Sequence, residues 1–219
     1  MDVFVFFVDA CESSQDVSTD DIIKKLPQCA VQSILSVKNP QVAYVKAVSA
    51  LLKYTVLSKM LSVNFNHISF GLMEKGKPYV SNFDGIHFNI SHTKNACAGI
   101  FAPFEVGVDI EFMRPTDMSI AKRFFTANEQ KYISEDESLS VSRFFEIWTK
   151  KEAFIKLTGE GLGRPLSSFD VFDEGLGVTF SHYINGSFSV SACAYAGNTI
   201  QKTLKVISAE ELFSSPAAI

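Results

Sequence analysis

Residues 143–157 predict an amphipathic helix, and no other segment constrains the fold as strongly. The segment reads Arg-Phe-Phe-Glu-Ile-Trp-Thr-Lys-Lys-Glu-Ala-Phe-Ile-Lys-Leu, and its apolar residues recur every three to four positions. This spacing collects Phe144, Ile147, Trp148 and Ile155 on one face of the helix. The helix must therefore pack that face against a core and leave its charged residues on another face.

The charged residues of this helix include a carboxylate and an ammonium group one turn apart. Glu152 and Lys156 are separated by four residues, and the plain explanation of that spacing is a surface ion pair. A second acidic group lies upstream, where Asp109 and Glu111 are two residues apart in Gly-Val-Asp-Ile-Glu. On a strand both side chains leave the same face, so they repel each other unless a cation or basic groups neutralise them.

Three carboxylates and one lysine would form a magnesium site if the strand and the helix converge. Mg²⁺ prefers oxygen ligands, takes a few protein carboxylates and completes its shell with water and substrate phosphate. A lysine beside such a site neutralises the phosphates. The set of Asp109, Glu111, Glu152 and Lys156 therefore indicates phosphoryl chemistry on a pyrophosphate. Without a phosphate partner, the same residues would be an ordinary salt-bridge network.

Length and composition bound the class of protein. The 219 residues suffice for one large domain or two small fused ones, and 47% apolar residues can fill a core. The 20 phenylalanines indicate either a thick aromatic interior or an exposed apolar surface that docks a partner. A net charge of -4 and the lack of a Lys/Arg cluster argue against nucleic acid as a partner.

Neither a targeting segment nor a membrane span is predicted. The apolar run 3–8 is short and is flanked by Asp2 and Asp9, so it indicates a first strand. No run approaches the length of about 20 apolar residues that spans a bilayer. The four cysteines are far apart and form no CxxC pair, which favours reduced thiols in a cytoplasmic protein. Pairing in an oxidising compartment stays open.

The hydrophobic pattern predicts an α+β fold. Asn39 can cap a helix and Pro40 suits its first position, so the longest helix should cover 40 to about 62. Each half of the chain has a helix with several strands around it, and Ala102-Pro103 is the best seam. We therefore predict two similar lobes, 1–104 and 105–219. The other predicted helices are 21–26, 120–125 and one opened by a Thr126–Glu129 capping box; the predicted strands are 67–72, 88–92, 96–101, 106–111, 171–172, 178–180, 187–195 and 203–207.

Three further polar residues lie at a strand end or in a turn. Ser91 and His92 follow Phe-Asn-Ile, and a turn with a hydrogen-bonded histidine would explain them. Lys77 in Gly-Lys-Pro would ordinarily be an exposed turn lysine. No Ser/His/Asp order, nucleophile elbow, P-loop or dinucleotide glycine pattern is present.

Three of these motifs, in this order, resemble the signature of one enzyme family. They are Asn89-Ile-Ser-His92, Gly107-Val-Asp-Ile-Glu111 and Trp148-Thr-Lys-Lys-Glu-Ala-Phe-Ile-Lys156. Their order and spacing are similar to those of the 4′-phosphopantetheinyl transferases of the surfactin-synthetase-activating type. Supporting matches extend the resemblance from about residue 70 to residue 195, and they are Gly76-Lys-Pro78, Ala121-Lys-Arg-Phe-Phe125 and Val190-Ser-Ala-Cys-Ala194.

The resemblance implies a fold, a reaction and partners. The fold would be a pseudo-dimer of two similar lobes, each a long helix on a small, mostly antiparallel sheet, in a monomeric chain. Coenzyme A would lie in the cleft between the lobes. The enzyme would transfer its phosphopantetheine arm to a serine of an acyl, peptidyl or aryl carrier protein and release adenosine 3′,5′-bisphosphate. The pathway would be fatty acid, polyketide or nonribosomal peptide synthesis.

The resemblance also implies roles for individual residues. Asp109, Glu111 and Glu152 would ligate Mg²⁺, or Mn²⁺, which suits similar ligands. Glu152, or a water that it positions, would accept the serine proton, and Lys156 would neutralise the leaving phosphate. The coenzyme phosphates would be contacted by Ser91 and His92, with Lys77 nearby, and Glu129 would be a further acid.

One segment departs from the family pattern. Members often carry several Lys and Arg residues between the first strand and the long helix, whereas residues 28–37 here are uncharged. A non-catalytic relative that binds carrier proteins but has lost coenzyme A binding is therefore an alternative. A metal-dependent pyrophosphate hydrolase would use the same acids. Whether the protein is a transferase or a non-catalytic relative, it would need a face that docks the carrier. Carriers are usually acidic around their target serine, so the candidates for that face are Lys122, Arg123 and Phe124.

Overall fold

The structure is a computed structural model that describes residues 2–11 and 17–215. Its helices are α1 (Thr19–Lys25), α2 (Gln28–Leu35), α3 (Pro40–Leu61), α4 (Ser119–Phe124), α5 (Ala127–Ser134), α6 (Ser140–Thr158) and α7 (Ala209–Ser214). Its strands are β1 (Val5–Asp9), β2 (Phe70–Leu72), β3 (Pro78–Val80), β4 (His87–Thr93), β5 (Ala96–Ala102), β6 (Val106–Phe112), β7 (Val178–Asn185), β8 (Phe188–Tyr195) and β9 (Leu204–Ile207). The predicted α+β class is confirmed.

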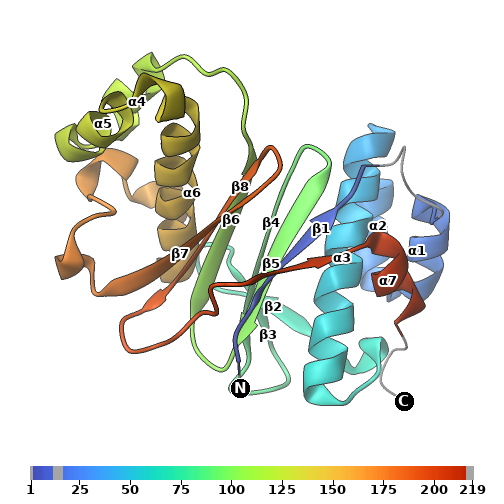
Figure 1. The fold of residues 1–219 in the computed structure, drawn as a ribbon. Helices are drawn as coiled ribbons and strands as arrows, with labels where there is room; N and C mark the ends of the chain where they lie inside the picture. Colours follow the sequence, from blue (N-terminus) through green and yellow to red (C-terminus); the bar gives the residue numbers. More distant parts are fainter. Residues whose placement is uncertain (1, 12–16, 216–219) are drawn as a thin grey trace.

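Two sheets lie between two helical layers (Figure 1). The first sheet has the order β4-β5-β1-β9 and the second has the order β6-β8-β7, while β2 and β3 form a separate hairpin. One apolar core fills the space between the facing sides of the two sheets. A second core joins the first sheet to α1, α2, α3 and α7, and a third joins the second sheet to α4, α5 and α6. This layering puts the two long helices, α3 and α6, on opposite outer sides.

The boundaries of α3 follow from local chemistry. Asn39 accepts a hydrogen bond from the Val42 amide at 3.1 Å, and Pro40 occupies the first turn, where a missing amide proton costs nothing. The helix ends at Ser62, which adopts the left-handed conformation. The predicted helix over 40–62 is therefore confirmed.

The two sheets meet along β4 and β6, the strands that carry two of the sequence motifs. The Asn89 side-chain oxygen accepts a hydrogen bond from the Val108 amide at 2.9 Å. Further along the same two strands, the Ser91 hydroxyl donates to Asp109 at 2.8 Å, and the Thr93 hydroxyl donates to Glu111 at 3.3 Å. Side chains of the two motifs are therefore brought together at this junction.

Some sequence predictions were wrong or incomplete. The uncharged segment after Pro27 is the helix α2, and residues 171–172 form no strand. β9 pairs in parallel with β1, so a strand from the second half of the chain completes the first sheet. The division into 1–104 and 105–219 stays a prediction. None of the four cysteines forms a disulfide within the described part of the chain. None of the described helices combines the length and the apolar character needed to cross a membrane.

Candidate functional site

A glycine lets the strand β6 approach the helix α6 closely. A Cβ atom on Gly107 would lie 2.0 Å from the Ala153 carbonyl oxygen and 2.5 Å from the Leu157 nitrogen. Side chains alternate along a strand, so Asp109 and Glu111 leave the same face of β6 as Gly107, the face toward α6. Their neighbours on the other face pack in the core between the sheets. The backbone contact at Gly107 therefore fixes the acidic pair against the helix that carries Glu152 and Lys156.

Asp109, Ser91 and Lys156 form a closed triangle of polar contacts. The Lys156 ammonium lies 2.6 Å from Asp109 Oδ1 and 2.8 Å from Ser91 Oγ, and the Ser91 hydroxyl donates to the same carboxylate oxygen at 2.8 Å. The Asp109 side chain is 6% exposed, whereas that of Lys156 is 29% exposed. The triangle thus presents a partly exposed cation above a buried carboxylate.

The two glutamates respond to the charge of Asp109. Burial raises the pKa of Glu111, and the negative charge of Asp109 raises it further. Burial and Asp109, in the same order, also raise the pKa of Glu152, while Lys156 opposes that shift. The buried Oδ2 atom of Asp109 has no hydrogen-bond partner within the described part of the chain. The three carboxylates therefore repel one another, and nearby cations such as Lys156 offset that repulsion only in part.

The carboxylates do not form a ready-made metal cluster. Among the residues that the structure describes, no group of three or more His, Cys, Asp or Glu side chains lies close enough to hold a metal ion. Asp109, Ser91 and Lys156 are in direct contact, whereas Glu111 and Glu152 interact with Asp109 through their charges.

His92 and Lys77 lie in different surroundings. The side chain of His92 is exposed, but nearby protein atoms partly shield its ring from water, and this desolvation lowers the pKa of the ring. The positive charges of Lys156 and Lys46 lower that pKa further. The plain interpretation of Lys77 as an exposed turn lysine is wrong, because its side chain is only 8% exposed, while its expected place near the coenzyme phosphates stays a prediction. It pairs with Glu105 at 2.6 Å and donates to the Leu157 carbonyl at 3.0 Å. Lys77 therefore ties the turn between β2 and β3 to the end of α6.

Glu129 does not join this group, so its assignment as a further acid of the site was wrong. Its carboxylate accepts hydrogen bonds from the amides of Thr126 and Val171, each at 2.8 Å, and pairs with Lys151 at 2.9 Å. The side chains of Glu129 and Lys151 are both fully buried. The capping box itself is confirmed, because Thr126 also accepts from the Glu129 amide. Every contact of Glu129 is therefore internal to the fold.

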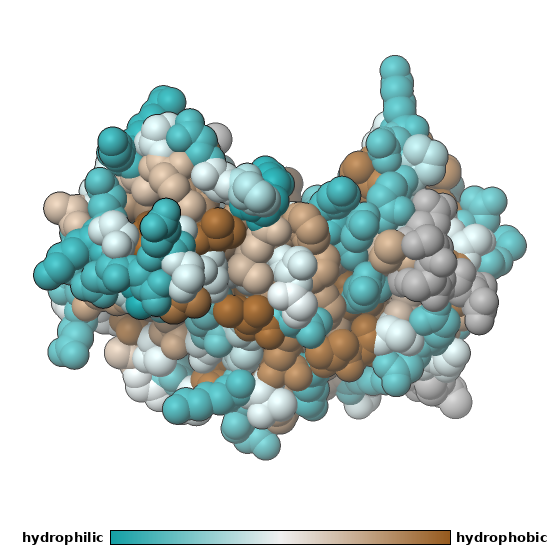
Figure 2. Space-filling model, turned by 45° about the horizontal axis from the view of Figure 1, so that its top comes forward, coloured by the Kyte–Doolittle hydropathy of each residue, from teal (hydrophilic) through white to brown (hydrophobic). Residues whose placement is uncertain are grey.

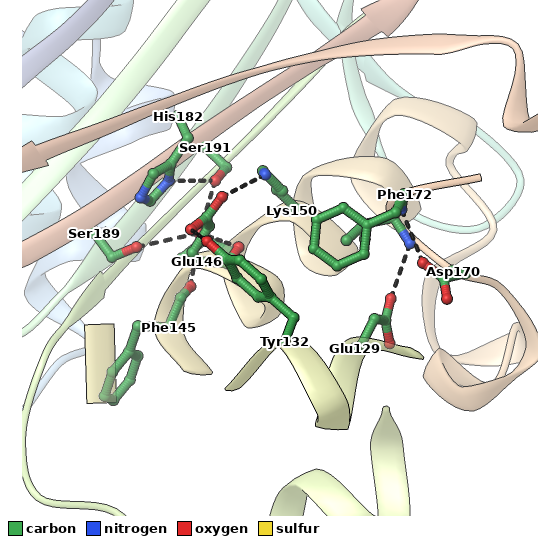
Figure 3. Close-up of polar contacts among 12 residues, drawn as sticks. Glu129, Tyr132, Phe145, Glu146, Lys150, Asp170, Phe172, His182, Ser189 and Ser191 are labelled. Atoms are coloured by element: carbon green, nitrogen blue, oxygen red, sulfur yellow. Dashed lines mark hydrogen bonds and ion pairs between the residues drawn. The ribbon is translucent and has the colours of Figure 1, made fainter. Parts of the chain in front are cut away.

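A further polar cluster lies along α6 and includes a serine–histidine pair (Figure 3). His182 Nδ1 is 3.0 Å from Ser191 Oγ, which is 2.8 Å from Thr149 Oγ1. Ser191 and Thr149 are fully buried, so no substrate can reach the serine oxygen. The cluster therefore fixes α6 on β8 and is not a hydrolase site. Sequence patterns gave no signal for it, because its members come from separate segments.

An open region adjoins the Lys156 end of this arrangement. A pocket of about 260 Å³ is lined by residues from three segments, including Lys77, Asn89, Lys156 and Gly159. In the space-filling view the face of the molecule is hollowed between the half that carries α4–α6 and the half that carries α3 (Figure 2). The site can therefore admit a ligand from solvent.

Comparison with known proteins identifies the segment that carries the acids. Residues 105–204 match the model of the 4′-phosphopantetheinyl transferase superfamily. The matched segment is a little under half of the chain. The resemblance on which the sequence analysis relied is therefore confirmed, and Asp109, Glu111, Glu152 and Lys156 all lie inside the matched segment.

Individual relatives give the same result. The chain is 40% identical over 118 residues to the 4′-phosphopantetheinyl transferase ffp of Bacillus subtilis, a match that covers 53% of each chain. It is 38% identical over 139 residues to the 4′-phosphopantetheinyl transferase gsp of Aneurinibacillus migulanus, covering 63% of this chain and 58% of the relative. A match of 36% over 118 residues links it to the transferase Sfp of Bacillus subtilis, with 53% of each chain covered. The matched part thus spans a little over half the length of these curated relatives.

Proposed function

We propose that the chain transfers the 4′-phosphopantetheine arm of coenzyme A to a serine of an acyl or peptidyl carrier protein and releases adenosine 3′,5′-bisphosphate. The observation that carries the proposal is the contact of Asp109 with Ser91 and Lys156 where the two sheets meet. Ser91, Asp109 and Lys156 come from the three different sequence motifs, so this contact brings all three motifs together. The named relatives are transferases of this kind, which favours an enzyme over a non-catalytic relative.

The donor set suits a magnesium ion. Asp109 Oδ2 is a buried acceptor without a protein partner, and the raised pKa values of Glu111 and Glu152 reflect burial and carboxylate repulsion. A divalent cation held by Asp109, Glu111 and Glu152 would relieve that repulsion, and oxygen ligands of this kind suit Mg²⁺ or Mn²⁺. When bound, the ion neutralises negative charge on the pyrophosphate of coenzyme A.

The reaction exchanges one bond to phosphorus for another. The carrier serine oxygen forms a bond to the phosphorus that bears the pantetheine arm, and the bond from that phosphorus to the bridging oxygen breaks. Adenosine 3′,5′-bisphosphate leaves with the electron pair of the broken bond. The serine proton passes to Glu152, directly or through a water that it positions.

Lys156 and its neighbours orient and neutralise the phosphates. The partly exposed Lys156 ammonium is fixed by Asp109 and Ser91, so it can donate to the leaving phosphate without first being ordered. Ser91 and His92 at the end of β4 would contact the coenzyme phosphates, and Lys77 lines the adjoining pocket. Positioning and charge neutralisation are the main contributions that phosphoryl transfer requires of a protein.

The proposal extends to architecture and location. We infer a monomeric enzyme whose two lobes are related as a pseudo-dimer, with magnesium and coenzyme A between them. The packing of α3 on the first sheet and of α6 on the second supports this view. The buried thiols of Cys97 and Cys193 are compatible with a cytoplasmic location. We further infer that the carrier belongs to fatty acid, polyketide or nonribosomal peptide synthesis.

The experiment is transfer to apo carrier proteins. With coenzyme A and Mg²⁺, an acyl or peptidyl carrier should gain the mass of one phosphopantetheine arm on serine. Glu152→Ala should abolish the gain, whereas Glu174→Ala, which removes an exposed carboxylate from the short 3-10 helix Glu174–Leu176, should not. A folded protein that modifies no carrier in a broad panel would refute the proposal. Release of free phosphopantetheine without a carrier would identify a pyrophosphate hydrolase instead.

A further inference from the structure

A row of polar side chains crosses the second sheet and begins at the proposed active site. Ser191 of β8 is paired in register with Asp109 of β6 on one side and with His182 of β7 on the other. Ser189 is in the same way the partner of Glu111. Residues directly opposite each other on neighbouring strands share a face of the sheet, so all five side chains face α6, as Figure 3 shows for those of β7 and β8. The row therefore continues the acidic pair across the sheet beneath α6.

Thr149 connects this row to α6. Its hydroxyl oxygen lies 2.8 Å from Ser191 Oγ and 3.3 Å from Ser189 Oγ, so it contacts the register partners of both acids of β6. Glu152 and Lys156 follow it at three and seven residues, a spacing that puts all three side chains on one side of the helix. Lys156 is in contact with β6. Glu152 therefore lies between one contact of α6 with β8 and one contact of α6 with β6.

The hydrogen bonds of this cluster run in one direction. Thr149 has one hydroxyl hydrogen and donates it to the Phe145 carbonyl at 2.9 Å, so its oxygen can only accept at the contact with Ser191. Because Ser191 uses its own hydrogen in that bond, its oxygen accepts from His182 Nδ1, which is 3.0 Å away. The donors thus lead from His182 through Ser191 and Thr149 to a carbonyl of α6, and both hydroxyls donate as well as accept.

Packing alone does not require hydroxyl groups at this place. Thr149, Ser189 and Ser191 are fully buried, and burial of a hydroxyl costs free energy that its hydrogen bonds must offset. Valine and alanine would fill the same space at lower cost, as apolar side chains do elsewhere along this interface. Apolar contacts have no preferred direction, whereas hydrogen bonds do. The hydroxyls therefore fix the register of α6 on β8, which apolar contacts would leave free to shift.

We propose that Thr149 is a positioning residue, which holds Glu152 opposite Asp109 through its hydrogen bonds to Ser191 and His182. The inference rests on the proposed function, in which Glu152 accepts the serine proton. Within the described part of the chain the Glu152 carboxylate interacts with its neighbours only through their charges and has no hydrogen-bond partner of its own. The backbone of α6 therefore decides where this carboxylate lies, and a proton acceptor must lie within hydrogen-bond reach of the proton that it takes.

The test removes one hydroxyl group and keeps the shape of the side chain. Thr149→Val should lower kcat for transfer to a carrier about tenfold, because Glu152 is then in position for only part of the time, and should change the KM for coenzyme A less than about twofold. Thr149→Ser retains the hydroxyl and should restore most of kcat. The matched control is Thr55→Val, because Thr55 is a buried threonine of α3 whose hydroxyl has no partner among the described residues. It should leave kcat unchanged.

Three results would overturn the assignment. They are a kcat that Thr149→Val leaves unchanged, an equal loss in Thr149→Ser, and a rise in the KM for coenzyme A as large as the loss of kcat. If the wild-type protein modifies no carrier, the proposed function fails, and calorimetry with Mn²⁺ decides about Thr149, because Glu152 is one of the oxygen ligands that suit this ion. Weaker binding by Thr149→Val alone supports the positioning role, whereas equal binding by all four proteins, or none by any, overturns it.

The direction of the hydrogen bonds has a signature that does not depend on activity. Burial lowers the pKa of His182 more than the negative charge of Glu146 raises it, so the ring is neutral at about pH 7.5. Nitrogen NMR distinguishes the two neutral forms of the ring, and His182→Gln identifies the signal. We expect the proton on Nδ1. A proton on Nε2 would mean that Ser191 donates to the histidine instead of to Thr149, and it would overturn the proposed chain.

Discussion

Lys151 and Lys156 leave the same helix five residues apart, and each pairs with one carboxylate. Lys151 lies 2.9 Å from Glu129, both side chains are fully buried, and backbone groups satisfy their remaining positions. Lys156 lies 2.6 Å from Asp109, its own side chain is 29% exposed, and Asp109 Oδ2 has no partner among the described residues. We call Lys151–Glu129 the saturated pair, because groups of the protein occupy its hydrogen-bonding positions, and Lys156–Asp109 the open pair, because one carboxylate oxygen is unoccupied by any described residue. A saturated pair can only hold the fold together, whereas an open pair can also bind a ligand.

The largest effect should follow from breaking the saturated pair. Lys151→Met leaves Glu129 as an uncompensated buried charge, and such a loss typically costs about 3–5 kcal/mol of unfolding free energy. Denaturant unfolding should show this loss. Transfer activity per folded molecule should persist, because neither residue lies at the candidate site. The double variant Lys151→Met/Glu129→Gln should recover part of the stability, and a stability unchanged by Lys151→Met would contradict the comparison.

Breaking the open pair should have the opposite outcome. Lys156→Met removes the cation that faces the leaving phosphate, and removal of one such group commonly lowers kcat by about 10²–10³-fold. Stability should fall less than in Lys151→Met, because Lys156 is partly exposed and Ser91 still donates to Asp109. Steady-state kinetics should thus show the larger loss of kcat in Lys156→Met, and thermal unfolding should show the larger loss of stability in Lys151→Met. Similar losses of stability in both would show that the two pairs do not differ in kind.

Lys53 adds a third case, a lysine of α3 that pairs with no carboxylate among the described residues and whose ammonium lies 4.0 Å from the centroid of the Phe70 ring. Its pKa of about 8 lies below that of an ordinary lysine, so below pH 8 the protonated amine destabilises the folded state. The shift limits this cost to about 3 kcal/mol, and partial exposure and the aromatic contacts reduce the expected value to about 1–2 kcal/mol. Lys53→Met should therefore stabilise the ligand-free protein at pH 7. The gain should shrink as pH rises above 8 and vanish near the pKa of a free lysine.

Thermal unfolding between pH 7 and 10 measures this dependence, with Lys59→Met, which changes an exposed lysine of the same helix, as the reference. Cys29, Tyr54 and Lys46 line the same cavity as Lys53 and also carry protons, so only the difference between the two variants isolates Lys53. A gain that is constant with pH would assign the effect to packing.

The sequence predicted those features of the fold that depend on neighbouring residues. The helical periods of α3 and α6, the Asn39 cap and the Thr126 capping box each follow from neighbouring residues, and all are observed. Contacts between distant segments were not predictable in the same way. The internal role of Glu129 depends on the Val171 amide and on Lys151, and the burial of Lys77 depends on Glu105. Residue type and spacing therefore predicted which acids are candidates for the site, but not which lysine each one pairs with.

The smallest effect should come from exposed lysine and arginine side chains that form no ion pair within the described ranges 2–11 and 17–215. Lys122 and Arg123 lie on the exposed side of α4, and Lys122 lines a groove of about 690 Å³ between α4 and α5. If this face docks an acidic carrier, Lys122→Glu/Arg123→Glu should raise the KM for the carrier about tenfold and leave the KM for coenzyme A unchanged. Added salt should narrow the difference, because it screens exposed charges.

The control for this pair is Lys24→Glu/Lys59→Glu, which changes the net charge equally on the other half of the molecule. Both lysines are exposed, on α1 and α3. An equal rise in carrier KM in the two double variants would assign the effect to overall charge and exclude a local docking face. A rise in the KM values for both carrier and coenzyme A in Lys122→Glu/Arg123→Glu would instead show that α4 supports the active site. Only a carrier-specific rise confined to α4 separates docking residues from those that bind coenzyme A, because the two substrates then respond to different lysines.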